Sequence, residues 1–212
     1  MRAYFLLLIF FSVFFIGCQS NPGSVKQALS TASQDKNNTP AKPYSYLKLQ
    51  TLEGRDTLLS SLMRNKASVF IFLAPDCPLS QSYTLTLNEL SKIYLKNNIL
   101  FYGIFPGTMY CIEKIKYFRQ KYLIEFPILL DTNYTLTHLC NATITPEAFV
   151  IDSTGTILYS GRIDNWAYEV SKKRAQITEH DLQDALESIV NNKPIAVAKT
   201  KAVGCFIEVP KK

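Results

Sequence analysis

The residues with the clearest chemical potential are the cysteines, and Cys77 has the most informative surroundings. It lies in Pro75-Asp76-Cys77-Pro78, directly after the continuous apolar run 68–73. Proline is well tolerated at the first position of a helix, so Pro78 predicts a helix that begins immediately after Cys77. The unpaired N–H groups and the dipole of a helix N-terminus stabilise a thiolate, the reactive form of cysteine. We therefore predict that Cys77 is a nucleophilic thiol on an exposed turn.

Ser80 would lie about one helical turn beyond Cys77, where its hydroxyl could point at the sulfur. The alternative is that Cys77 is an inert core residue, since free cysteines are commonly buried. The two prolines and Asp76 around the thiol favour the exposed, reactive interpretation.

Four further cysteines raise the question of a partner thiol. If Cys18 is modified, as argued below, the remaining four thiols allow three complete pairings, and the sequence cannot choose between them. We expect Cys205 to resolve a disulfide formed at Cys77, because it follows Gly204 in a short apolar tail that could fold back. A structural Cys111–Cys140 bridge and an inert Cys140 are the alternatives. The two histidines share no ligand spacing with a cysteine pair, so neither a metal site nor a cofactor is predicted.

The N-terminus is typical of an exported lipoprotein. After Met1-Arg2, residues 3–16 are almost wholly apolar, which is too short for the roughly 20 residues of a membrane-spanning helix. The run ends in Gly17-Cys18, which resembles the bacterial lipobox. This predicts a signal peptide over 1–17, lipidation of Cys18 and attachment to a membrane. An uncleaved anchor with an incidental cysteine is the alternative.

Residues 18–43 are polar and show no apolar period, so we expect a lipidated cysteine followed by a flexible tether. The residues after Cys18 lack the aspartate that resembles an inner-membrane retention signal. We therefore expect a location in the bacterial cell envelope, on the outer membrane facing the periplasm. Export also removes the reducing cytosol, so disulfide chemistry is permitted.

The rest of the chain, 44–212, is predicted to form one α/β domain. Its length and the 47% hydrophobic content of the chain suit a single core. Strands alternating with helices imply a mainly parallel sheet with helices on both faces, and a late hairpin adds antiparallel strands at one side. The expected strands are 46–50, 68–73, 99–104, 126–130, 147–151 and 156–160, and the expected helices are 58–62, 78–97, 111–122, 133–140 and a last one capped by Thr178 and ending near Val190.

This order, with two local motifs, resembles the thioredoxin-like superfamily, and within it the redoxin group that includes AhpC/TSA and TlpA-like proteins. Residues 70–80 resemble the strand-to-helix junction that carries the active cysteine, and 145–152 resemble the cis-proline loop and its following strand. The tail 200–207 is similar to the ending of a redoxin subgroup with Cys-Pro-x-Ser sites. The resemblance covers 44–207 and implies a three-layer sandwich with a mixed sheet and helices on both faces.

The resemblance also implies a set of site residues. The Thr145–Pro146 peptide would be cis, and the backbone beside it would face the active sulfur and pair with an extended substrate. Ser80 stands where the second cysteine of a Cys-x-x-Cys motif is usual, so the partner thiol must come from elsewhere. Glu147 is the nearest candidate base. The implied catalytic residues are Cys77 and Cys205, and the implied substrate-binding residues are Pro78, Ser80, Thr145, Pro146 and Glu147.

These features favour a thiol–disulfide oxidoreductase that acts on protein or small-molecule thiols and disulfides. One alternative is a thiol peroxidase of the peroxiredoxin type, although Ala74 and Phe70 replace that family's threonine and proline. The other is a non-catalytic binding lipoprotein that uses the same fold. The formal net charge of +6 comes from scattered lysines without an aromatic-interleaved basic stripe, so nucleic-acid binding is not expected.

Overall fold

A computed structural model of the protein describes residues 46–210. The predicted signal peptide, the predicted lipidation site Cys18 and the predicted tether over 18–43 lie outside the described residues. Among the helices of 46–210, none combines the length and apolar character that crossing a membrane requires.

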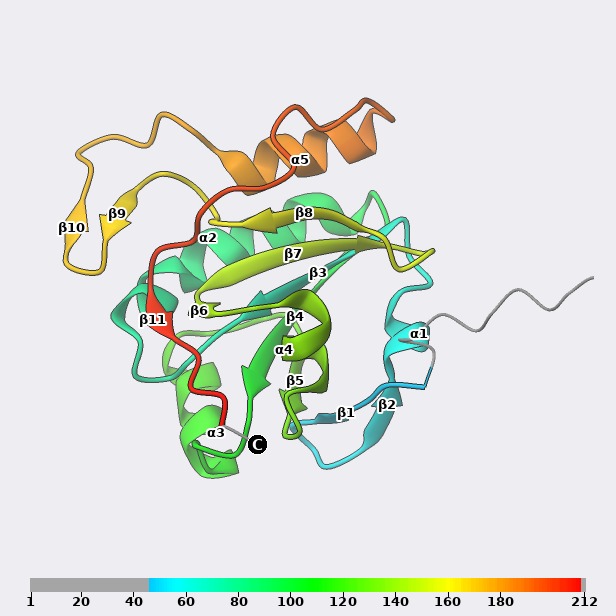
Figure 1. Ribbon diagram of the computed structural model, residues 1–212, viewed down its shortest axis with the longest axis vertical. Coiled ribbons are helices and arrows are strands. Elements are labelled where there is room, and N and C mark those ends of the chain that lie inside the picture. Colours follow the sequence, from blue (N-terminus) through cyan, green and yellow to red (C-terminus); the bar gives the residue numbers. More distant parts are fainter. Residues whose placement is uncertain (1–45, 211–212) are drawn as a thin grey trace, which may run out of the picture. The chain divides into compact units, whose positions relative to one another are not determined.

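The core of the described domain is a seven-stranded sheet with the order β2-β1-β5-β4-β3-β7-β8 (Figure 1). β4 runs parallel to β3 and β5, while the other neighbouring pairs of this sheet within residues 46–210 are antiparallel. The mixed sheet is confirmed, but the mainly parallel arrangement is wrong, because β1 forms a hairpin with β2 and pairs antiparallel with β5. The strands are β1 Lys48–Thr51, β2 Asp56–Leu58, β3 Ala67–Phe72, β4 Ile99–Pro106, β5 Ile128–Asp131, β7 Glu147–Asp152 and β8 Ile157–Gly161.

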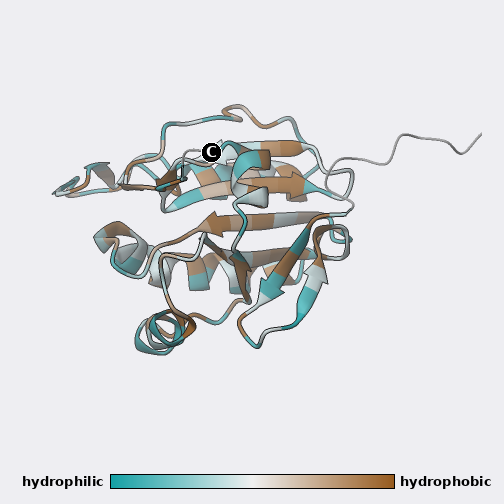
Figure 2. Cartoon of the chain, turned by 60° about the horizontal axis from the view of Figure 1, so that its bottom comes forward, coloured by the Kyte–Doolittle hydropathy of each residue, from teal (hydrophilic) through white to brown (hydrophobic). Residues whose placement is uncertain are grey.

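Helices cover both faces of this sheet, as predicted. Alternation along β3 explains the two layers: Val69 and Ile71 pack into one apolar cluster, and Phe70 and Phe72 into the other. Helices α2, α3 and α5 contribute to the first cluster, while α1 and α4 contribute to the second. Figure 2 shows the apolar residues gathered in the central strands. The helices are α1 Leu59–Leu62, α2 Pro78–Leu95, α3 Ile112–Lys121, α4 Thr135–Cys140 and α5 Asp181–Val190.

Four short strands lie outside the central sheet and were not predicted. β9 (Ala167–Glu169) pairs with β10 (Lys172–Lys173), and β6 (Ile144–Thr145) pairs with β11 (Cys205–Phe206). Strands of two or three residues carry too little pattern to be seen in a sequence. The predicted cap of the last helix is also wrong: His180 occupies the N-cap of α5, and the Thr178 hydroxyl instead accepts a hydrogen bond from Asn165 Nδ2 at 2.7 Å.

Asp131 links β5 to α4 through a buried carboxylate. It is 2% exposed and accepts hydrogen bonds from the N–H groups of Thr135, Leu136 and Thr137, and from the Thr137 hydroxyl at 2.7 Å. These N–H groups belong to the first turn of α4 and have no partner within the helix. The Asp131 carboxylate therefore fixes the start of α4 against the end of the sheet.

Replacing Asp131 with alanine is expected to lower the free energy of unfolding by about 2–4 kcal/mol, because several buried donors lose their acceptor at once. Urea denaturation of the purified domain measures this change. The matched control is Asp152→Ala, in which a half-buried turn carboxylate that accepts bonds from Thr154 and Thr156 is removed. We expect the control to cost about 1 kcal/mol or less. Equal losses in the two variants would contradict the role given to Asp131.

Candidate active site

Cys77 occupies the N-cap of α2, and Pro78 is the first residue of that helix, as the sequence predicts. The expectation of an exposed turn is wrong for the thiol itself. Asp76 and Pro78 are exposed, but Cys77 is 1% exposed. The thiol lies at the edge of the apolar cluster formed with α2, and the C-terminal tail of the same chain lies against it.

The Thr145–Pro146 peptide bond is cis, as the resemblance implies. The Cys77 thiol donates a hydrogen bond to the Thr145 carbonyl, with 3.0 Å between sulfur and oxygen. The backbone beside Pro146 therefore faces the sulfur of Cys77. Thr145 itself is buried, so this contact lies within the fold and not at its surface.

Cys205 reaches Cys77 through strand pairing. β11 runs antiparallel to β6, and Cys205 is the register partner of Thr145. The two sulfur atoms are 2.6 Å apart, and both cysteines are free thiols. The sequence-predicted pair is therefore brought together across 128 residues of chain. A nucleophile and a second thiol at this distance can form a disulfide without a change of fold.

The pKa values of the two thiols are shifted in opposite directions. Burial raises the pKa of Cys77, but the Cys205 thiol and the Ser80 backbone N–H donate hydrogen bonds to its sulfur, and the net result is a lowered pKa. Burial also raises the pKa of Cys205, and its bond to Cys77 and the charge of Asp76 raise it further. The arrangement therefore favours a thiolate on Cys77 and a protonated thiol on Cys205.

Ser80 contributes in a different way from the one predicted. Its hydroxyl accepts a hydrogen bond from the Ala74 N–H at 3.3 Å, so the hydroxyl is used to close the turn before the helix. The group of Ser80 that faces Cys77 is its backbone N–H. Pro78 is exposed. A helix N-terminus thus stabilises the sulfur mainly through its backbone.

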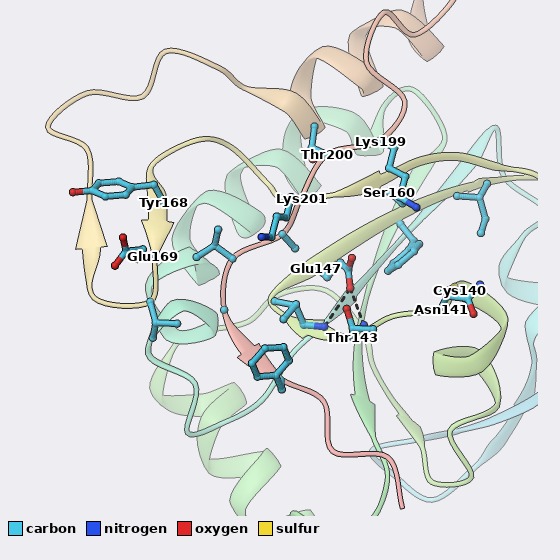
Figure 3. Close-up of a pocket in the computed structure, with 18 of the residues that line it drawn as sticks. Cys140, Asn141, Thr143, Glu147, Ser160, Tyr168, Glu169, Lys199, Thr200 and Lys201 are labelled. Carbon is cyan, nitrogen blue, oxygen red and sulfur yellow. Dashed lines mark hydrogen bonds between the residues drawn. The ribbon is translucent and has the colours of Figure 1, made fainter. Parts of the chain in front are cut away.

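The structure does not bring Glu147, the predicted base, together with the thiols. It is the register partner of Phe72, whose side chain packs into the cluster on the opposite face of the sheet from Cys77. Its carboxylate accepts hydrogen bonds from the N–H groups of Thr143 and Ile144 at 3.0 and 3.3 Å (Figure 3). Burial raises its pKa. Glu147 shapes the loop before the cis-proline and has no direct part at the sulfur.

Tyr110 is a site residue that sequence reasoning missed. Its hydroxyl donates to Asp76, and Lys114 forms an ion pair with the same carboxylate at 3.5 Å. Burial, the hydrogen bond to Asp76 and the negative charge of that carboxylate raise the pKa of Tyr110. Asp76 could be seen in the motif, but its partners come from the loop before α3 and from α3 itself. No local pattern joins those segments to Cys77.

The predicted alternative of a Cys111–Cys140 bridge is wrong. Cys111 is exposed at the N-cap of α3, while Cys140 is buried at the end of α4 in the cluster of the other face. Both are free thiols. Burial raises the pKa of Cys140 well above its usual range, so it stays protonated. Cys140 is therefore a core residue, in agreement with the inert role that was left open for it.

Several solved structures share this fold. A hypothetical protein from Sinorhizobium meliloti 1021 has 19% identity and a TM-score of 0.68, over 77% of this chain and 91% of its own. An uncharacterized conserved protein from Geobacillus kaustophilus has 20% identity and a TM-score of 0.67, over 78% and 89%. A secreted Mycobacterium tuberculosis disulfide oxidoreductase has 20% identity and a TM-score of 0.50, over 72% and 99%. A search of curated protein sequences finds no match.

The fold and the paired thiols define a thioredoxin-like domain of the redoxin type. The AhpC/TSA family matches residues 40–160, which is more than half of the sequence, and the chain belongs to that family. The resemblance to the redoxin family is thereby confirmed, while the structural neighbours support the fold alone at these identities.

Proposed function

We propose that the protein is a thiol–disulfide oxidoreductase in which Cys77 is the attacking thiol and Cys205 the resolving thiol. The observation that carries this proposal is the 2.6 Å approach of the two sulfurs beside the cis-proline loop. The similarity to a Mycobacterium tuberculosis disulfide oxidoreductase supports the same class of reaction. The substrates would be disulfides of proteins or of small molecules.

The reaction balances with these two thiols alone. The Cys77 thiolate attacks one sulfur of a substrate disulfide, which forms a mixed disulfide and releases the other substrate sulfur as a thiolate. Cys205 then passes its proton to the substrate thiolate released in the first step, directly or through water, and attacks the Cys77 sulfur, which forms the Cys77–Cys205 disulfide and releases the second substrate thiolate. The substrate disulfide is reduced by two electrons and the protein is oxidised by two. The same steps in reverse oxidise a dithiol.

The experiment compares two oxidants on the fully reduced protein. We expect oxidised glutathione to be reduced at the same rate as Cys77 is oxidised. Oxidation of Cys77 by an equal concentration of hydrogen peroxide should be much slower. Faster reaction with peroxide, with a sulfenic acid at Cys77, would assign a thiol peroxidase instead. No reaction of Cys77 with either oxidant would assign a binding module.

The lowered pKa of Cys77 predicts a pH profile. A thiolate reacts and a thiol does not, so the alkylation rate of Cys77 by iodoacetamide should rise with pH as the thiol ionises. The midpoint is expected below 9, the usual value for cysteine, because hydrogen bonds favour the charged form. Peptide mapping by mass spectrometry follows Cys77 separately from the other thiols. A midpoint at 9 or above would contradict the proposed thiolate stabilisation.

We further propose that this domain works in the bacterial cell envelope, held to the outer membrane through a lipid on Cys18 and facing the periplasm. The lipobox-like Phe15-Ile16-Gly17-Cys18 and the polar stretch after it support this location. Labelled palmitate should be incorporated into the wild-type chain and not into the Cys18→Ser variant. Equal labelling of the two chains would refute the anchor.

A further inference from the structure

The attacking thiol is closed off by the protein's own tail. Cys77 is 1% exposed, and the Cys205 sulfur occupies the position 2.6 Å from it. β11 also occupies the pairing edge of β6, next to the Thr145 carbonyl. A substrate sulfur must reach Cys77 to form a mixed disulfide, so it cannot do so while the tail stays in this place.

The tail is firmly attached upstream of this closure. The Thr200 N–H donates to the Ser160 carbonyl at 2.9 Å, and the Ser160 N–H donates to the Ala198 carbonyl at 3.0 Å. The Thr200 hydroxyl also bonds to the Tyr159 hydroxyl and accepts from the Arg162 N–H. Ala202, two residues further on, is buried. This attachment to β8 and its following loop involves backbone and side chain together.

The downstream attachment relies on groups that are only partly buried: the Thr145 hydroxyl donates to the Cys205 carbonyl at 3.4 Å, and Val203, Cys205 and Ile207 pack against the apolar clusters. β11 has two residues, and beyond it the Ile207 N–H donates to the Thr143 carbonyl at 2.9 Å. The Phe206 side chain is 82% exposed and packs little. Between the two attachments, Lys201 to Gly204 run along a cavity of about 1110 Å³ (Figure 3). A two-residue strand pair is marginal by itself, so this end of the tail is the part that can detach.

Gly204 sets how closely the tail can return. A Cβ atom at this position would lie 2.0 Å from the Thr145 carbonyl oxygen, 2.7 Å from its carbon and 2.9 Å from Ile144 Cγ2. The first two are backbone atoms next to the cis-proline, which cannot move aside as a flexible side chain would. Any other residue at 204 would therefore hold the tail away from β6, and Cys205 away from Cys77.

We propose that residues 203–207 form a hinged strap, and that Gly204 is the positioning residue that lets the strap seat Cys205 against Cys77. With the strap detached, Cys77 is open to a substrate disulfide. With the strap seated, Cys205 resolves the mixed disulfide and closes the site. The inference rests on the proposed function for its chemistry, but the movement of the strap can be measured without any disulfide.

The test is the Gly204→Ala variant, for which two rates should change in opposite directions. A detachable segment is open in about 0.1–10% of molecules, so holding it open should speed alkylation of Cys77 by iodoacetamide by at least about tenfold. Formation of the Cys77–Cys205 disulfide with oxidised glutathione should slow by about 100-fold, the effect of misplacing a reacting group by about 1 Å. Purely structural damage would not produce faster alkylation confined to Cys77.

The matched control is Phe206→Ala, which alters the same strand at an exposed side chain and should leave both rates near those of the wild type. Unchanged rates in Gly204→Ala would overturn the strap. Failure of the wild type to react with oxidised glutathione would refute the proposed function. The alkylation rates of Cys77 in the wild type and in Gly204→Ala would still test the strap, because alkylation involves no disulfide.

Hydrogen exchange on the wild type gives a second measurement that needs no variant. The Ile207 amide should exchange faster than the Thr200 amide, because the downstream end opens while the upstream end stays attached. Equal protection of the two amides would overturn the strap even if the Gly204→Ala variant did not fold.

Discussion

Cys77→Ser is expected to abolish disulfide exchange, with a loss of at least about 1,000-fold in the rate of substrate reduction. A serine hydroxyl does not ionise near neutral pH and cannot form a disulfide, so the first step has no nucleophile. The fold should persist, because the serine hydroxyl can still donate to the Thr145 carbonyl that Cys77 contacts. Reduction of oxidised glutathione under single-turnover conditions measures this loss.

The control for this result is Cys111→Ser. Like Cys77, Cys111 is a free thiol at the N-cap of a helix, but Cys111 is exposed, caps α3, and no described contact joins it to the thiol pair. Its replacement should leave the rate unchanged. Full activity in Cys77→Ser, or a comparable loss in Cys111→Ser, would contradict the role of attacking thiol given to Cys77.

Cys205→Ser is expected to stop the cycle half-way. The first attack by Cys77 remains possible, but among residues 46–210 no other thiol is in contact with Cys77 to resolve the mixed disulfide. The adduct between Cys77 and glutathione should therefore accumulate, with one adduct for each protein molecule. Turnover should fall by about 100-fold or more, because an intramolecular thiol is replaced by a thiol from solution.

Intact-mass spectrometry after mixing with oxidised glutathione measures the adduct directly. The same Cys111→Ser control should show the wild-type pattern, in which the adduct is transient. Rapid loss of the adduct in Cys205→Ser would mean that another group resolves it. Cys205 would then not be the resolving thiol. An excess of added dithiothreitol should restore turnover in the variant, since it supplies the missing thiol.

Much of the fold follows from local patterns. The continuous apolar run at 68–73 predicts a strand buried on both faces, and β3 is buried along its whole length. Pro78 after Cys77 predicts the start of α2, because a proline needs no N–H at that position. The short strands of two or three residues were missed, since they are held by their partners and carry little pattern of their own.

Less of the site could be predicted from the sequence, because the contacts within the site join segments that are far apart in the chain. The exposure of Cys77 was predicted from its neighbours, but its burial depends on a tail 128 residues away. Glu147 follows Pro146 directly, yet strand alternation directs it to the opposite face from the thiol. The bond between Tyr110 and Asp76 likewise depends on how the loop before α3 packs, which local pattern does not record.

Disulfide mapping of the oxidised protein tests the central claim most directly. The reduced protein is treated with one equivalent of oxidised glutathione and digested without a reducing agent. The disulfide-linked peptides are then identified by mass spectrometry. We expect a Cys77–Cys205 link with Cys111 and Cys140 still reduced. A link between Cys77 and either of those cysteines, or a Cys77 that stays reduced while Cys205 pairs elsewhere, would contradict the account.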